Sequence, residues 1–205
     1  MTRAEAGQIL SAEAKRFHAR GWMMGTAGNL SVKVADAPLR FYITASGRDK
    51  GELLPDDIAL AGDNGIAVAE DGRPNAPKPS AEAGLHARIY QRTGCGAVFH
   101  VHTVSAVAAG ALHAKTGGRL SLTGLEMLKG IGYEAEGETV HIPVIPNSQN
   151  MAELADRFDG NRVEKTPGLI VASHGLYAWG ADAPRTRHHV EIFEWLFQYL
   201  AHTAR

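Results

Sequence analysis

The chain has 205 residues, of which 44% are hydrophobic, and this is enough for one domain with a sizeable core that spans residues 1–205. Its formal net charge is −1 and its lysines and arginines form no run, so the sequence gives no sign of a nucleic-acid partner or of binding to an anionic membrane. Cys95 is the single cysteine, which excludes an internal disulfide, and the sequence has neither a signal-peptide pattern nor a long apolar run, so we expect a soluble protein of the reducing cytoplasm.

The first third of the chain predicts a helix followed by two strands. An apolar stripe that includes Leu10 and Phe17 predicts a helix over residues 4–20, ended by Gly21. Alternating apolar residues predict a strand over residues 30–34, and a second strand follows over residues 40–44.

Two turns rich in small residues lie at comparable ends of these two strands. They are Gly28-Asn29 and Ser46-Gly47, and both offer free backbone N–H groups of the kind that bind phosphate. Lys50 could add a positive charge nearby. Each turn taken singly can also be read as a turn with no ligand.

The next segment predicts a hairpin and then a helix. Residues 58–60 and 66–68 flank Asn64-Gly65, a pair typical of a two-residue hairpin turn. A loop over residues 71–78 leads to a helix over residues 80–93, for which Ser80 is a suitable N-cap. Glu82 lies in the first turn, where its carboxylate can simply interact favourably with the helix dipole or can face a site at the mouth of the fold.

The strand over residues 97–102 carries the pattern His-Val-His. Successive side chains of a strand point to opposite faces, so His100 and His102 share one face, with Cα atoms roughly 6.5–7 Å apart. Imidazoles at that separation can converge on one metal ion, although a buried histidine satisfied by a hydrogen bond is the more common case.

A helix is predicted after Thr103, ended by Thr116-Gly117-Gly118, and a short helical run follows over residues 122–131. In that run Glu126 and Lys129 are i,i+3 neighbours and could form a surface ion pair. A strand over residues 140–145 and a helix over residues 151–158 come next.

The strand over residues 169–174 ends in His174-Gly175, and the last helix begins after Asp182. A histidine at the end of a buried strand, released by a glycine, has the geometry expected of a third metal ligand. His113 and His141 compete for that role, since the other histidines lie in predicted helices.

Five motifs occur together in a fixed order, and jointly they resemble the class II aldolase and adducin-head family over residues 4–202. They are Gly-Thr-Ala-Gly-Asn-Leu-Ser (25–31), Thr-Ala-Ser-Gly (44–47), Lys-Pro-Ser-Ala-Glu (78–82), His-Val-His (100–102) and His-Gly-Leu (174–176). Three longer matches, at residues 44–51, 126–130 and 174–180, resemble the dehydratase subgroup that acts on a methylthiopentulose phosphate in methionine salvage.

The resemblance implies a three-layer α/β/α fold with a largely antiparallel central sheet, a homotetramer with sites near subunit boundaries, and one zinc ion per subunit. The metal ligands would be His100, His102 and His174. Three histidines also suit manganese, iron or cobalt.

The resemblance also assigns roles to other residues. The catalytic carboxylate of the aldolases corresponds to Glu82, and the acid/base of the dehydratases corresponds to Glu126, which we favour. Phosphate contacts correspond to Gly28, Asn29, Ser46, Gly47 and Ser80, while Ala81 replaces a second serine of the aldolases.

The implied reaction removes water from a 5-methylthiopentulose 1-phosphate to give a 2,3-diketone. Abstraction of the C3 proton requires a Lewis acid and a carboxylate. Two alternatives are an aldolase or pentulose-phosphate 4-epimerase acting on another sugar phosphate, and an adducin-like assembly domain without catalysis.

Overall fold

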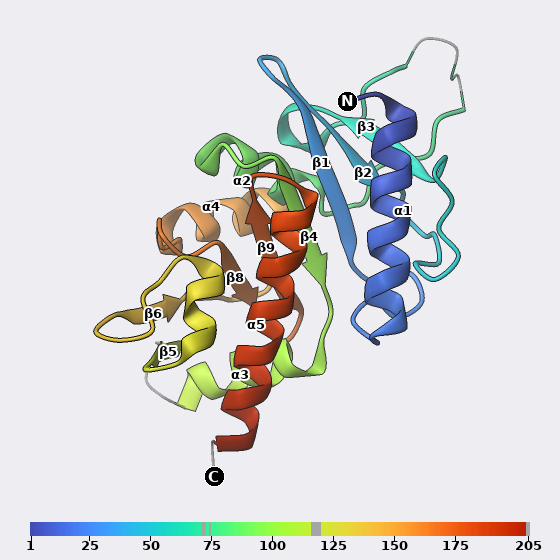
Figure 1. The fold of residues 1–205 in the computed structure, drawn as a ribbon. Helices are drawn as coiled ribbons and strands as arrows, with labels where there is room; N and C mark the ends of the chain where they lie inside the picture. Colours follow the sequence, from blue (N-terminus) through green and yellow to red (C-terminus); the bar gives the residue numbers. More distant parts are fainter. Residues whose placement is uncertain (71–72, 74, 116–119, 204–205) are drawn as a thin grey trace.

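A computed structural model describes residues 1–70, 73, 75–115 and 120–203, and its centre is a mixed sheet (Figure 1). Within these residues a seven-stranded sheet has the order β3-β2-β1-β4-β9-β8-β7, and every pair is antiparallel except β7 with β8. Its strands are β1 (Asn29–Asp36), β2 (Leu39–Thr44), β3 (Ile58–Ala61), β4 (Ala97–Val101), β7 (Val144–Ile145), β8 (Gly168–Val171) and β9 (Gly175–Gly180). β5 (Leu120–Thr123) and β6 (Thr139–Ile142) form a separate pair.

Helices cover both faces of the sheet, which confirms the predicted three-layer architecture. The first face is covered by α1 (Arg3–Ala19), α3 (Val104–Lys115) and α5 (Ala183–Thr203), and the second by α2 (Ala83–Thr93) and α4 (Met151–Asn161). No helix among the described residues combines the length and the apolar character that a bilayer crossing requires.

Strand β4 lies near the middle of the sheet and divides its side chains between the two cores. Ala97, Phe99 and Val101 are buried with α1 and α5, whereas Val98 is buried beneath α2. His100 therefore faces the second layer, as the alternation of the strand predicts.

The predicted hairpin at residues 58–68 is only partly formed. Asn64 and Gly65 both have positive φ angles, 58° and 74°, as the turn requires, but the second arm is reduced to one bridge between Ala61 and Ala67. Gly65 lies so close to the backbone of Ala83 that a Cβ atom would come within 2.3 Å of it. The turn thus packs against the start of α2 instead of extending a ladder.

Four further predictions need correction. The helical run predicted over residues 122–131 is a strand up to Thr123 and a 3₁₀ helix only from Glu126. The strand predicted over residues 169–174 ends at Val171, so His174 lies in the turn before β9.

Helix α2 begins at Ala83, and Glu82 occupies the N-cap position in place of Ser80. The predicted strand over residues 140–145 is divided at Pro143, which has no N–H group to continue a ladder. The predicted break at residues 116–118 and residues 71, 72 and 74 of the predicted loop lie outside the described residues.

Candidate metal centre

Three histidine rings converge where β4 meets the turn between β8 and β9. Nε2 of His100 lies 2.8 Å from Nε2 of His102 and 3.3 Å from Nε2 of His174. Two nitrogens bound to one tetrahedral metal at 2.0–2.1 Å would lie about 3.3 Å apart. The three nitrogens are therefore spaced as the ligands of a single ion.

Neighbouring groups fix the orientation of two of these rings. The Nδ1–H group of His100 donates to the carbonyl of Leu176 at 2.9 Å, and Nδ1 of His174 lies 3.3 Å from Oδ1 of Asn147. With Nδ1 used as a donor, Nε2 of a neutral imidazole presents its lone pair to the centre. Burial lowers the pKa of His100 to about 3, so this ring is neutral at physiological pH.

The sheet register places a tyrosine directly beneath His100. Tyr177 is the cross-strand partner of His100, and the two rings stack with their centroids 3.9 Å apart. On the other side of β4, Asn29 of β1 is paired with His100 as well. Asn29, His100 and Tyr177 therefore lie side by side on the adjacent strands β1, β4 and β9, with His100 in the middle.

Glu82 completes the cluster, and its ligand atom and those of the three histidines all lie within 4.8 Å of one another. Oε1 of Glu82 lies 2.9 Å from Nε2 of His174, and Oε2 accepts a hydrogen bond from the side chain of Asn29. Burial alone would raise the pKa of Glu82, but His100, His174 and Asn29 outweigh it and hold this pKa below its ordinary value. The carboxylate is therefore ionised at neutral pH.

Two glycines allow the strands to approach at the centre. A Cβ atom on Gly175 would lie 2.3 Å from the carbonyl oxygen of Val101, and one on Gly28 would lie 2.7 Å from that of His100. Gly28 also has a φ of +75°, which favours glycine. Glycine at these positions brings β9 and the residues before β1 close to the histidine pair.

The donor set fits a divalent metal ion. Three imidazole nitrogens with a carboxylate alongside are typical ligands of catalytic zinc, and the contacts to Leu176 and Asn147 correspond to the outer interactions that orient such ligands.

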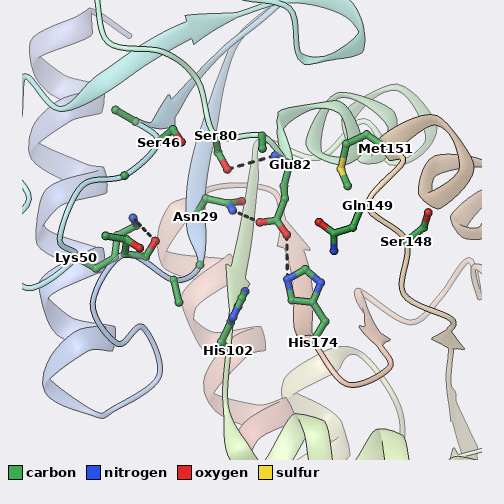
Figure 2. A pocket seen from close by; sticks show the side chains of 16 residues that line it. Asn29, Ser46, Lys50, Ser80, Glu82, His102, Ser148, Gln149, Met151 and His174 are labelled. Carbon is green, nitrogen blue, oxygen red and sulfur yellow. Dashed lines mark hydrogen bonds and ion pairs between the residues drawn. The ribbon is translucent and has the colours of Figure 1, made fainter.

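The cluster opens onto a cavity of about 290 Å³ that brings together most of the residues singled out from the sequence. His102, His174 and Glu82 line it. So do the six residues predicted to contact phosphate: Gly28, Asn29, Ser46, Gly47, Lys50 and Ser80 (Figure 2). Their role in phosphate binding stays a prediction.

Lys50 is held in a fixed position at one end of this cavity. The side chain is only 1% exposed, and its Nζ donates to the carbonyls of Thr26 at 3.0 Å and Arg48 at 2.8 Å. Burial lowers the pKa of Lys50. An ammonium group has three donors, so these two bonds leave one for an anion in the cavity.

Glu126 lies elsewhere. It begins the short 3₁₀ helix η2 (Glu126–Ile131), its side chain is 77% exposed, and it pairs with Lys129 at 2.7 Å. Leu128 and Ile131 anchor η2 in the core shared with α5. Within one chain, then, Glu126 does not line the cavity, and its role as acid/base remains a prediction.

Sequence reasoning missed several residues around the centre. Tyr177 was overlooked because residues 175–180 were not identified as a strand, although Tyr177 and Trp179 alternate with small or aliphatic residues. Asn147, which contacts His174, and the cavity-lining residues Ser148 and Gln149 were given no role, and Met151, which also lines the cavity, was predicted only as the first residue of a helix.

The fold and the centre define a class of protein, and the chain belongs to the Class II Aldolase and Adducin N-terminal domain family, whose profile matches residues 8–201. It is 37% identical to the methylthioribulose-1-phosphate dehydratase of Persephonella marina over 199 residues, 96% of this chain and 89% of the relative. The dehydratase of the same name from Bacillus thuringiensis subsp. konkukian is 35% identical, over 93% of this chain and 86% of the relative. Among solved structures, L-fuculose-1-phosphate aldolase from Thermus thermophilus superposes with a TM-score of 0.73 at 25% identity, covering 98% of this chain and 95% of the aldolase.

Proposed function

We propose that this chain dehydrates 5-methylthioribulose 1-phosphate to 5-methylthio-2,3-diketopentyl 1-phosphate, a step of methionine salvage. The observation that carries the proposal is the cluster of His100, His102, His174 and Glu82. It opens onto a cavity that is also lined by the turns Gly28-Asn29 and Ser46-Gly47, which are predicted to bind phosphate. The relatives named for this activity, which match over most of the chain, support it further.

We propose zinc as the metal, held by His100, His102 and His174. A divalent zinc ion bound there would supply a Lewis acid that draws electron density from the C2 carbonyl of the substrate and makes the C3 proton more acidic.

The residues of the chain would bind the substrate and move its protons. The turns at Gly28 and Ser46, with Lys50, would hold the 1-phosphate at one end of the cavity. Glu82 is ionised and directed into the cavity, so it can accept a proton from C3 or orient the group that does. The C4 hydroxyl then leaves as water, and the enol formed between C3 and C4 converts to the 3-ketone.

We propose that Glu126 is the second proton-transferring group and that a neighbouring subunit of a homotetramer supplies it. This proposal reconciles the motif at residues 126–130 with the exposed position of Glu126 in one chain.

Purified, zinc-loaded protein incubated with 5-methylthioribulose 1-phosphate tests the function. We expect a product lighter by one water, detected by mass spectrometry, together with diketone absorbance. A His102→Ala variant serves as the control without a complete centre. Release of an aldehyde would instead indicate the aldolase alternative, and absence of turnover with zinc bound would contradict the proposal.

A further inference from the structure

We infer that Met151, the first residue of α4, binds the methylthio end of the substrate and determines specificity for it. This inference rests on the proposed function, because it takes the sugar phosphate as the ligand of the cavity. It assigns a role to Met151, which no motif of the sequence predicted.

The cavity has two ends on either side of the metal centre. Figure 2 shows Ser46 and Lys50 on one side of Glu82 and His174, and Gln149 and Met151 on the other. The substrate is a short unbranched chain with its phosphate on C1 and its sulfur on C5. If the phosphate occupies the Lys50 end and the C2 and C3 oxygens face the histidines, C5 must extend toward Met151.

Met151 has the chemistry that a methylthio group requires. Among the described residues that line the cavity, it is the only apolar side chain larger than alanine. A thioether fills irregular apolar space and makes favourable dispersion contacts, which a second thioether can match. The polar and charged residues toward the Lys50 end would instead leave a methylthio group without apolar contacts.

Packing against α2 holds Met151 in place. The side chain is half-buried against the core of the second layer, and its Cβ would lie 3.3 Å from a Cβ added to Gly84. Glycine at position 84 thus lets the first residue of α4 lie close to α2, at a position two residues after Glu82. Met151 is therefore positioned relative to the carboxylate of the centre.

The preceding turn is stabilised by its own hydrogen bonds. Arg157 donates to the carbonyls of Pro146 and Asn147, both at 2.8 Å, and Oδ1 of Asn150 accepts from the N–H of Ala152 at 3.0 Å. Asn147 also contacts His174 at 3.3 Å. The turn that precedes Met151 thus contacts a metal ligand through Asn147. The apolar end of the cavity is therefore formed before the substrate binds.

Substrate discrimination tests this role directly. We compare kcat/KM for 5-methylthioribulose 1-phosphate with that for ribulose 1-phosphate, which carries a hydroxyl on C5. Because apolar contacts of this size are worth about 10-fold or more in discrimination, Met151→Ala should lower kcat/KM for the methylthio substrate roughly 10-fold and leave the value for ribulose 1-phosphate within about 2-fold. Met151→Leu, which keeps the apolar volume, should retain most of the preference.

A binding measurement separates recognition from chemistry. The 2-hydroxy analogues obtained by reducing the two ketoses are not dehydrated, and calorimetry gives the Kd of each. Met151→Ala should weaken only the methylthio analogue. Met24→Ala alters a methionine that is 60% exposed and outside the cavity, and it should change neither Kd.

The outcomes distinguish this inference from the proposed function. If the wild-type protein does not dehydrate the methylthio substrate, the proposed function fails. If it does, but Met151→Ala weakens both substrates equally or neither, the function stands and the role of Met151 is refuted. Zinc content and melting temperature, measured on every variant, show whether an equal loss comes from damage to the fold.

Discussion

Replacing Glu82 by glutamine removes one negative charge at the centre of the site and keeps the shape of the side chain. Glu82 lies 2.9 Å from Nε2 of His174 and is the only carboxylate among the described residues that line the cavity. A positioned acid/base contributes about 10²- to 10⁴-fold to a proton transfer, so we expect Glu82→Gln to lower kcat by a factor in this range.

The three histidines remain in Glu82→Gln, so zinc should still bind. Loss of a neighbouring carboxylate typically weakens metal affinity about 10- to 100-fold, and the assay therefore uses saturating zinc with the bound metal measured by elemental analysis. Dehydration is followed as diketone absorbance. Initial rates over a range of substrate concentrations separate kcat from KM.

Glu70→Gln provides a matched control. The Glu70 side chain is 13% exposed, close to the 17% of Glu82, but it pairs with Arg73 outside the cavity. We expect this variant to keep wild-type kcat. Near-normal turnover by Glu82→Gln with a full complement of zinc would refute the reasoning and leave Glu126 as the acid/base.

Four further predictions follow from the geometry. If Glu126 acts from a neighbouring subunit, Glu126→Gln and His102→Ala should each be inactive alone. Tetramers refolded from an equal mixture should recover roughly a quarter of wild-type activity, because about that share of the sites combines an intact His102 with an intact Glu126. No recovery would contradict a site shared between subunits. Removing the metal with a chelator should lower the melting temperature, because the metal binds the folded state only. Zinc at about 100 times its Kd should restore about 2.7 kcal/mol of stability. An unchanged melting temperature would contradict metal binding by the folded protein. The Tyr177 hydroxyl is buried and makes no hydrogen bond of good geometry among the described residues, although burial and the nearby charge of Glu82 raise its pKa. Tyr177→Phe removes this hydroxyl and keeps the stacked ring, so the free energy of unfolding should not fall by more than about 1 kcal/mol in urea titrations. Burial raises the pKa of Cys95 to about 11, so at pH 8 the thiol stays protonated and iodoacetamide should label it only after unfolding; rapid labelling of the native protein would contradict this.

The sequence predicted the parts of the site that depend on local geometry. His100 and His102 share a face because a strand alternates, and this rule needs no knowledge of the neighbouring strands. His174 was predicted as the last residue of a strand, but β8 ends at Val171 and His174 lies in the turn before β9. The structure brings the three rings together and leaves His113 and His141 outside the cluster.

The parts that the sequence did not predict depend on register between distant strands. Tyr177 supports His100 only because residue 100 pairs with residue 177, and nothing local to residues 175–180 specifies that partner. The N-cap position of Glu82 has a similar cause. Its carboxylate contacts His174 and Asn29 instead of the first N–H groups of the helix, and these contacts form only in the tertiary fold.

The number of carboxylates at the site bears on the assembly. The proposed dehydration needs one group to take the C3 proton and another, or the same one, to protonate the departing C4 hydroxyl. Within one chain the described cavity supplies Glu82, while Glu126 faces outward beside Lys129. If both groups take part, the catalytic site is completed where two subunits meet, and the oligomer is a requirement of the chemistry because a separate monomer would hold the metal and the phosphate but lack the second proton-transferring group.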